Sequence, residues 1–447
     1  MYLYYAKRLW SMLKSRLTHK LCVLVLLCAP MLLHASVVRT VRAQFVDSET
    51  LEPYSMPERP ILYINSGTPE IGAQGDANGH LLEVSFDEMS HDFRQFTYTV
   101  RHTNADGTPD ALATNEYING FTTQDITDYT PSLNTQQVYT HYRFFFPNDD
   151  MRLTLSGRYE LTIYEDGDPE RVVTRVPLWV CDTRVRTDAQ VLSNTDKEFS
   201  GRYQQLEIEL QTDGRSTDLR SDYFIIVQQN GRTDNRVIAP EPTFADYKTL
   251  RWQHCRQLIF EGGDEYRHFD AYSTYFAGTG IDRIVYENGD YHALLNADQL
   301  RNNLPYSHEY DVNGQYRVHA ERVQDVDTEA EYMWVHWMLQ VDKPYFDGAI
   351  YVGGDLFGNT FSLRNRMDYD NTLHCYYLSA LVKQGGYDYQ YWFVPKQVES
   401  QKSKVESPAT LLRTEGSHWE TRNEYTIYVY YKPFGARYEQ LVGVKVL

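Results

Sequence analysis

The sequence has little cysteine and no cysteine spacing that suggests a structural framework. Only five of its 447 residues are cysteine, and no Cys-x-x-Cys pair occurs. This sparse pattern argues against a disulfide scaffold and against a zinc ribbon. Two of the five cysteines lie in the first 28 residues, which leaves Cys181, Cys255 and Cys375 in the rest of the chain. One long-range bridge among these three is an alternative, but we expect three buried free thiols.

Catalytic and nucleotide-binding motifs are also missing. The chain contains no G-x-S-x-G, no H-E-x-x-H and no G-x-x-x-x-G-K-[ST]. His308 and Glu309 stand next to each other, but the second histidine that a zinc protease needs one helical turn later is absent. The sequence therefore predicts a protein that is not an enzyme, with no catalytic, cofactor-binding or metal-binding residues.

Basic side chains are scarce relative to acidic ones. There are 43 Lys and Arg against 61 Asp and Glu, and the formal net charge is −18. Residues 1–43 hold seven basic and no acidic side chains, so their removal would raise the excess of acidic residues to 25. Such a surface repels phosphate, which argues against nucleic acid or anionic lipid as a partner.

Long apolar runs are absent outside the N-terminus. A basic segment precedes the apolar residues 21–33, a pattern typical of a secretory signal and too short to span a bilayer comfortably. We predict a signal peptide over residues 1–43, with cleavage after Ala35 or Ala43. An N-terminal membrane anchor is the alternative. No other run approaches the roughly 20 residues of a spanning helix, so the mature chain is predicted to be soluble, without direct membrane insertion.

Aromatic residues are abundant, and 37 of them are tyrosine. Tyrosine suits strands that pack on one face and meet water on the other. Residues 96–102 alternate in this way, with Phe96, Tyr98 and Val100 on one face. Further strands are predicted at residues 61–64, 81–86, 138–146, 157–164, 206–210, 223–227, 315–320, 332–341, 349–352, 373–382, 387–394 and 424–431. The predicted class is all-β, with tandem immunoglobulin-like or early-set β-sandwich domains.

The predicted domains are an N-terminal β-sandwich over 44–181, a central β-rich domain over 182–328 and a C-terminal β-sandwich over 329–447. Residues 181–186 and the charged residues 325–331 mark the two boundaries. One short helix is predicted at 298–304, and the polar residues 397–407 are predicted to form a mobile loop.

The central motif, residues 260–270, combines two glycines with six acidic, arginine or histidine side chains. Gly262 and Gly263 permit a tight turn or a close backbone approach. We expect Arg267 to lie between Asp264 and Asp270, in the two-pronged geometry that arginine favours. Glu265 belongs to the same motif, which we interpret as a structural corner.

Three alternatives stay open at this stage. A hydrolase would use Asp264 and Asp270 as its acids. Residues 104–110, around Asp106, space oxygen atoms like a calcium loop, although the distal glutamate of an EF-hand is missing and turns rich in Asp, Asn and Gly look the same. A carbohydrate-binding β-sandwich is the third alternative, because Tyr389, Tyr391 or Trp392 could stack on sugars if they are exposed; the competing reading is an aromatic core.

Taken in order, short motifs along nearly the whole mature chain resemble one family, the plug subunit of the type IX secretion translocon, formerly a domain of unknown function. They are residues 116–121, 128–135, 139–148, 156–159, 262–270, 311–314, 383–391, 420–425 and 438–443. Two departures occur. The family usually has a His-Cys and Asp-Trp run where this chain has residues 102–107, and it more often has Asn where this chain has Asp264.

The resemblance implies a periplasmic protein at the inner face of the outer membrane. Its partner would be the outer-membrane barrel of the translocon, on whose periplasmic mouth it docks to seal the pore between substrates. No small-molecule substrate is implied. The residues that contact the partner are not identified by the sequence.

Overall fold

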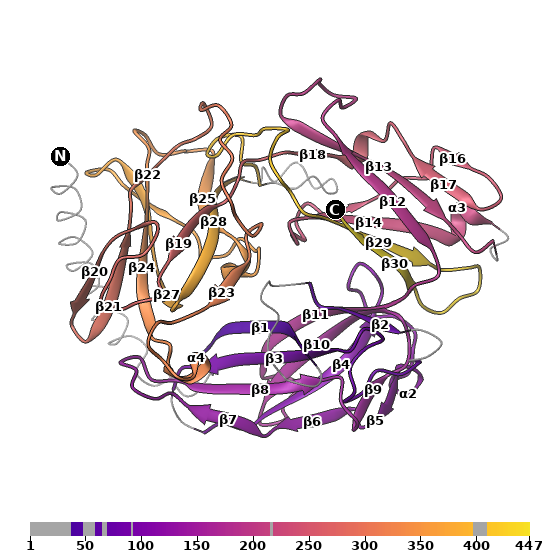
Figure 1. The fold of residues 1–447 in the computed structure, drawn as a ribbon, viewed down its shortest axis with the longest axis horizontal. Coiled ribbons are helices and arrows are strands. Elements are labelled where there is room, and N and C mark those ends of the chain that lie inside the picture. The colour runs from indigo at the N-terminus through magenta and orange to yellow at the C-terminus, as the bar shows by residue number, and fades with distance from the viewer. Residues whose placement is uncertain (1–36, 48–58, 65–68, 91–92, 215–217, 397–408) are drawn as a thin grey trace.

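The computed structural model describes residues 37–47, 59–64, 69–90, 93–214, 218–396 and 409–447. The chain is nearly all β, and its strands form three lobes, each built from two packed sheets (Figure 1). The predicted all-β sandwich class is confirmed. Lobe 1 contains residues 37–182, lobe 2 contains 183–262 and 417–447, and lobe 3 contains 263–416, in each case within the described ranges. Residues 1–36 of the predicted signal peptide and the predicted loop 397–407 lie outside those ranges.

Lobe 1 packs two sheets around a core of aromatic and aliphatic side chains. One sheet has the order β1 (Val38–Asp47), β3 (His80–Glu88), β8 (Thr140–Phe146), β7 (Asp128–Pro131). The other has the order β2 (Ile61–Ile64), β11 (Val172–Asp182), β10 (Gly157–Glu165), β4 (Phe96–Thr103), β6 (Thr123–Ile126). The short helix α2 (Thr114–Tyr117) precedes a small pair, β5 (Ile118–Gly120) and β9 (Met151–Leu153). Phe96, Tyr98 and Val100 are buried together, as their alternation predicts.

Lobe 2 is completed by the C-terminus of the chain. Its first sheet has β12 (Arg186–Leu192), β13 (Tyr203–Gln211), β17 (Thr249–Trp252) and β16 (Phe244–Ala245), with β18 (Ile259–Glu261) also paired to β13. Its second sheet has β15 (Val237–Ile238), β14 (Tyr223–Gln229), β29 (Tyr425–Tyr431) and β30 (Gln440–Val446). The helix α3 (Leu219–Asp222) and the 3-10 turn η1 (Arg256–Leu258) connect these strands. The strands therefore group differently from the predicted bounds, which assign residues 424–431 to the third domain.

Lobe 3 is inserted between the two parts of lobe 2. One sheet has β20 (Ile281–Glu287), β21 (Asp290–Leu295), β24 (Tyr332–Gln340), β27 (Cys375–Lys383) and β26 (Asp368–Asp370), with β22 (Asp298–Gln299) on β24. The other has β19 (Arg267–Asp270), β28 (Gly385–Pro395) and β23 (Tyr316–Val318), with β25 (Gly348–Gly353) on β28. The helix α4 (Val326–Glu329) and the turn η2 (Asp355–Phe357) lie in its loops. The prediction of a helix at 298–304 is wrong, because Asp298 and Gln299 form strand β22, which pairs with β24.

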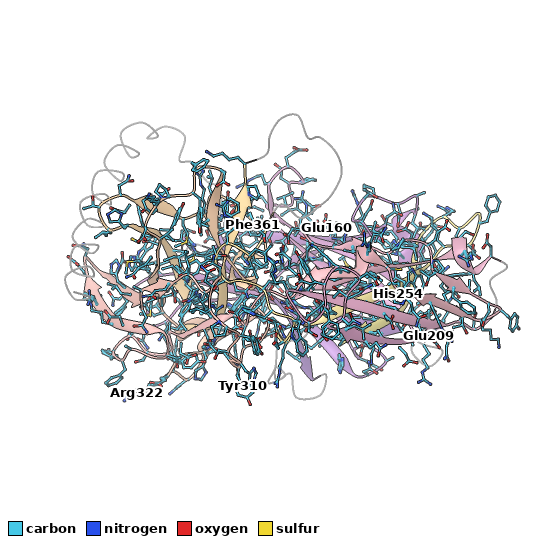
Figure 2. All side chains as sticks on the ribbon, turned by 90° about the horizontal axis from the view of Figure 1, so that it is seen from above. Glu160, Glu209, His254, Tyr310, Arg322 and Phe361 are labelled. Carbon is cyan, nitrogen blue, oxygen red and sulfur yellow. The ribbon has the colours of Figure 1, made fainter. Side chains whose placement is uncertain are left out.

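The three lobes form a triangle, with lobe 3 at the upper left, lobe 2 at the upper right and lobe 1 below (Figure 1). Tyr310 and Arg322 lie at one margin when the molecule is seen from above (Figure 2). Lobes 1 and 2 meet through apolar side chains, among them Trp179 and Tyr428, whose rings stack with centroids 5.1 Å apart. No helix in the described ranges is long and apolar enough to cross a bilayer.

Two sequence expectations concern covalent features. Cys181, Cys255 and Cys375 are free and buried, as expected. Ala43 lies inside β1, which pairs with β3 from Val38 to Asp47. Cleavage after Ala43 would remove the first part of β1, so the predicted bound at residue 43 conflicts with an intact strand, and of the two predicted cleavage sites only Ala35 leaves β1 whole.

Candidate functional site

The central motif is the place where the chain crosses between lobes 2 and 3. Residues 262–266 leave lobe 2 beside residues 415–421, which return to it. The backbone N–H of His418 donates to the carbonyl of Gly263 at 2.8 Å, and the N–H of Gly263 donates to Ser417 Oγ at 3.0 Å. A Cβ on Gly262 would lie 2.0 Å from the carbonyl oxygen of His418, and Gly263 has a φ of +67°. The paired glycines thus permit the close approach of the two crossing segments.

Arg267 does not lie between Asp264 and Asp270, and that prediction is corrected. Its Nε and Nη2 donate to Glu415 at 3.0 and 2.9 Å, and its Nη1 donates to Asp298 at 2.7 Å. The physical reason is strand alternation. Arg267 opens β19, so residues an odd number of positions later, including Asp270, face the opposite side of the sheet.

Glu415 is the centre of this cluster, and its side chain is fully buried. It also accepts from Arg301 Nε at 2.8 Å and from the backbone N–H of Tyr391 at 2.9 Å. Burial alone would raise the pKa of Glu415, but Arg267 and Arg301 hold it at about 2. The Glu415 carboxylate is therefore ionised and fully engaged, as a buried charge must be to be tolerated.

The other acids of the motif point in different directions. Asp264 lies 3.4 Å from Arg301 Nε, and burial raises the pKa of Asp264. Glu265 accepts a hydrogen bond from Tyr306 Oη at 2.5 Å. Asp270 contacts His268 Nε2 at 2.8 Å. Asp264 and Asp270 therefore belong to separate clusters and do not form the acid pair that a glycosidase needs.

His268 links two carboxylates of lobe 3. Its Nδ1 lies 2.7 Å from Asp388 Oδ1, and its Nε2 lies 2.8 Å from Asp270 Oδ1. The hydrogen bond with Asp388, joined by that with Asp270 and opposed by burial, raises the pKa of His268 to about 9. The imidazolium is thus charged at neutral pH and acts as a bridge between strands β19 and β28.

A second buried cluster joins lobe 1 to lobe 3. Lys383 Nζ on β27 donates to Asp87 Oδ2 on β3 at 2.7 Å. Asp87 also accepts from Tyr332 Oη at 2.7 Å and contacts His141 Nδ1 at 2.7 Å. All four residues are buried. Sequence reasoning missed this cluster; the signal that it left is a single lysine at the end of the otherwise uncharged strand 375–383.

Further polar contacts reinforce the same junction. Arg42 Nη2 lies 2.5 Å from Asp327 Oδ1, and burial of Asp327 is outweighed by Arg42, which lowers the pKa of Asp327 to about 2. The backbone N–H groups of Gln136 and Gln137, in the loop before β8, donate to Glu331 at 2.5 and 3.0 Å. Lobe 1 therefore contacts lobe 3 through several hydrogen bonds and ion pairs along one interface.

Arg59 connects all three lobes. It comes just before β2 in lobe 1. Its Nε donates to Glu424 of lobe 2 at 2.9 Å, and its Nη1 donates to Asp355 of lobe 3 at 3.3 Å. One guanidinium thus connects all three lobes, because its planar group can donate to two carboxylates at once.

The proposed sugar-stacking residues are not available at the surface. Tyr389, Tyr391 and Trp392 are 4%, 0% and 5% exposed. Tyr389 and Tyr391 both donate to Asp298 Oδ2, and the guanidinium of Arg232 covers the ring of Trp392 at 3.7 Å. These aromatic side chains make contacts in the interior of the protein. The expectation that they are exposed and could stack on sugars is therefore wrong.

The loop around Asp106 is stabilised by its own hydrogen bonds. Asp106 Oδ1 accepts from the N–H and Oγ1 of Thr108 at 2.8 and 2.6 Å, the pattern of a turn closed by an aspartate. Within the part of the chain that the structure describes, no group of three or more His, Cys, Asp or Glu side chains is arranged to hold a metal ion.

Together, these clusters define a class of protein: a multi-lobed β-sandwich protein in which buried charges join the lobes. Residues 66–182 match the family model described as the type 9 secretion system plug protein 1st domain, which falls within lobe 1. This match to the first domain agrees with the resemblance to the type IX secretion plug family that the sequence motifs indicated.

A solved structure resembles the whole molecule. It is the crystal structure of a hypothetical protein from Parabacteroides merdae ATCC 43184, with a TM-score of 0.82 and 31% sequence identity. The similarity covers 92% of this chain and 96% of that chain. A comparison with curated proteins gives no match. The three-lobed architecture is therefore shared along almost the full length of both chains.

Proposed function

We propose that this protein is the periplasmic plug subunit of the type IX secretion translocon. It docks on the periplasmic mouth of the outer-membrane barrel and seals the pore while no substrate is passing. The observation that carries the proposal is the match of residues 66–182 to the first domain of the plug family. It acts by shape and contact, without bond-making chemistry.

The junctions between lobes support this role physically. A barrel of up to 36 strands is wide enough to leak unless it is closed. A stopper for such a pore must keep its lobes in fixed positions, and here Lys383–Asp87, Arg42–Asp327 and the contacts of Arg59 hold lobe against lobe. The Lys383–Asp87 pair is fully buried, so removing one of its two charges costs roughly 3–5 kcal/mol.

The test has a binding arm and a sealing arm. For binding, the tagged protein is purified from detergent-solubilised outer membranes, and the barrel is expected to co-purify. For sealing, deletion of the gene is expected to let a small, normally excluded solute cross the outer membrane, and the wild-type gene is expected to restore the barrier. Unchanged permeability in the deletion strain, together with no barrel in the purified fraction, would refute the proposal.

A further inference from the structure

A small cavity lies at the contact between lobe 1 and lobe 2. Strands β10 and β11 of lobe 1 approach β14 and β29 of lobe 2 there (Figure 1). The cavity volume is about 40 Å³, whereas a single water needs roughly 10–15 Å³. The stacked rings of Trp179 and Tyr428 form part of its wall, and Gln228 adds a polar group. The space suits a group of a few heavy atoms.

Two arginines line this cavity, one from each lobe. Arg158 lies on β10, and Arg236 comes just before β15. Arg158 Nη1 donates to Thr103 Oγ1 at 2.9 Å, and Arg236 Nη1 donates to the carbonyl of Ala105 at 3.3 Å. Within the described ranges, no carboxylate oxygen lies within 4.0 Å of either guanidinium. Each guanidinium carries five N–H donors, so most of them are left for another acceptor.

Two acids, Glu160 and Asp106, act on these arginines through space, but their closest contacts are with other groups. Asp106 accepts hydrogen bonds within its own turn, and Glu160 pairs with Arg175 at 3.4 Å. At the other lobe junctions, by contrast, Arg42 and Arg59 contact carboxylates at 2.5 and 2.9 Å. The cavity therefore differs from those two junctions because, in the described part of the chain, neither of its arginines is in direct contact with a carboxylate.

Two cations that line one small cavity disfavour each other. Burial lowers the pKa of Arg158; Tyr430, Glu160 and Asp106 oppose this, and the nearby positive charge of Arg236 adds to it. Two like charges in a half-buried space repel each other more strongly than they would in bulk water. An anion placed between them would remove this repulsion and accept hydrogen bonds from both sides.

We propose that this cavity binds a small oxyanion of the carboxylate or phosphate class between Arg158 and Arg236. The planar fork of arginine matches the paired oxygens of both groups. Because the two arginines belong to different lobes, the bound anion bridges lobe 1 and lobe 2. Because the anion binds the folded protein and not the unfolded chain, its binding stabilises the contact between lobe 1 and lobe 2.

The test follows the indole signals of the full-length protein labelled with ¹⁵N-tryptophan. Inorganic phosphate and, separately, acetate are titrated at constant ionic strength maintained with sodium chloride. We expect a saturating shift of the Trp179 signal, with the signals of the other tryptophans unchanged. Arg158→Gln and Arg236→Gln are expected to weaken binding at least tenfold, whereas Arg175→Gln, on the same sheet but outside the cavity, is expected to leave it unchanged.

The two titrations also assign the ligand class. Saturation at lower phosphate than acetate concentration indicates a phosphate site, and the reverse order indicates a carboxylate site. A shift that grows linearly without saturation, that affects all tryptophans equally, or that persists in Arg236→Gln would overturn the proposal. If Arg158→Gln does not fold, the wild-type titration and the Arg236→Gln variant decide the question alone.

Discussion

Replacing the buried carboxylate at the crossover between lobes 2 and 3 is expected to destabilise the protein strongly. Glu415→Gln keeps the size of the side chain but removes the charge that faces Arg267 and Arg301. Removing one partner of a buried ion pair costs roughly 3–5 kcal/mol. The pKa leads to a similar magnitude. Its fall from 4.5 to about 2 on folding, at about 1.4 kcal/mol per pKa unit, corresponds to about 3 kcal/mol.

The pH dependence of this effect has a definite sign. The pKa of Glu415 is lower in the folded than in the unfolded chain, so its stabilisation is present above pH 4.5 and is lost as the pH falls toward about 2. The difference in the free energy of unfolding between wild type and Glu415→Gln should therefore be largest at neutral pH. It should shrink steadily between pH 4.5 and 2.

Urea unfolding followed by tryptophan fluorescence measures this difference from the midpoint and slope of the transition. The matched control is Glu160→Gln, because Glu160 forms a partly exposed pair with Arg175 at 3.4 Å, and such pairs contribute about 0–1 kcal/mol. A loss below about 1 kcal/mol for Glu415→Gln, or a loss that does not change with pH, would refute the reasoning from burial and charge.

The remaining predictions concern other buried contacts. Lys383→Met leaves Asp87 buried without its cation and should cost about 3–5 kcal/mol in urea unfolding, whereas exposed Lys396→Met should change stability by less than about 0.5 kcal/mol; equal effects would contradict this. His268, whose pKa is raised to about 9, stabilises the protein below pH 6.5, and this contribution should disappear as the pH rises through 9. His268→Gln should flatten that part of the pH profile, and an NMR titration that gives an ordinary imidazole pKa would refute it. Tyr391→Phe removes one hydrogen bond to a buried carboxylate and should cost about 1–3 kcal/mol in thermal or urea unfolding; a neutral effect would argue against the burial of that hydroxyl.

Strand positions were predictable wherever polar and apolar residues alternate. Residues 96–102 and 332–341 give the observed strands β4 and β24 almost to the residue. The hairpin of β20 and β21 was missed, although Asn288 and Gly289 separate the two strands with φ values of +56° and +94°. That Asn-Gly pair is the usual signature of a two-residue hairpin, so the signal was in the sequence.

The partners of Arg267 were not predictable from the chain alone. Glu415 lies 148 residues away, and nothing local distinguishes it from the many other acids in the sequence. The neighbouring Asp264 and Asp270 are closer in sequence and therefore more suggestive, yet alternation along β19 already excludes Asp270. The predicted domain bounds could not anticipate long-range strand pairing either. Strand β29 pairs with β14, which lies some 200 residues earlier in the chain, and Gln229 lies opposite Tyr425 in this pair.

The return of β29 and β30 to lobe 2 imposes an order on biogenesis. Their side chains Tyr425, Ile427, Val429 and Val442 belong to the lobe 2 core, so lobe 2 stays unfinished until residues 425–446 have been made. Lobe 1 contains all of its own strands and is free to fold earlier, as N-terminal units commonly do during synthesis. A polypeptide that ends before these strands would therefore expose the core of lobe 2, which chaperones and proteases can distinguish from the finished protein.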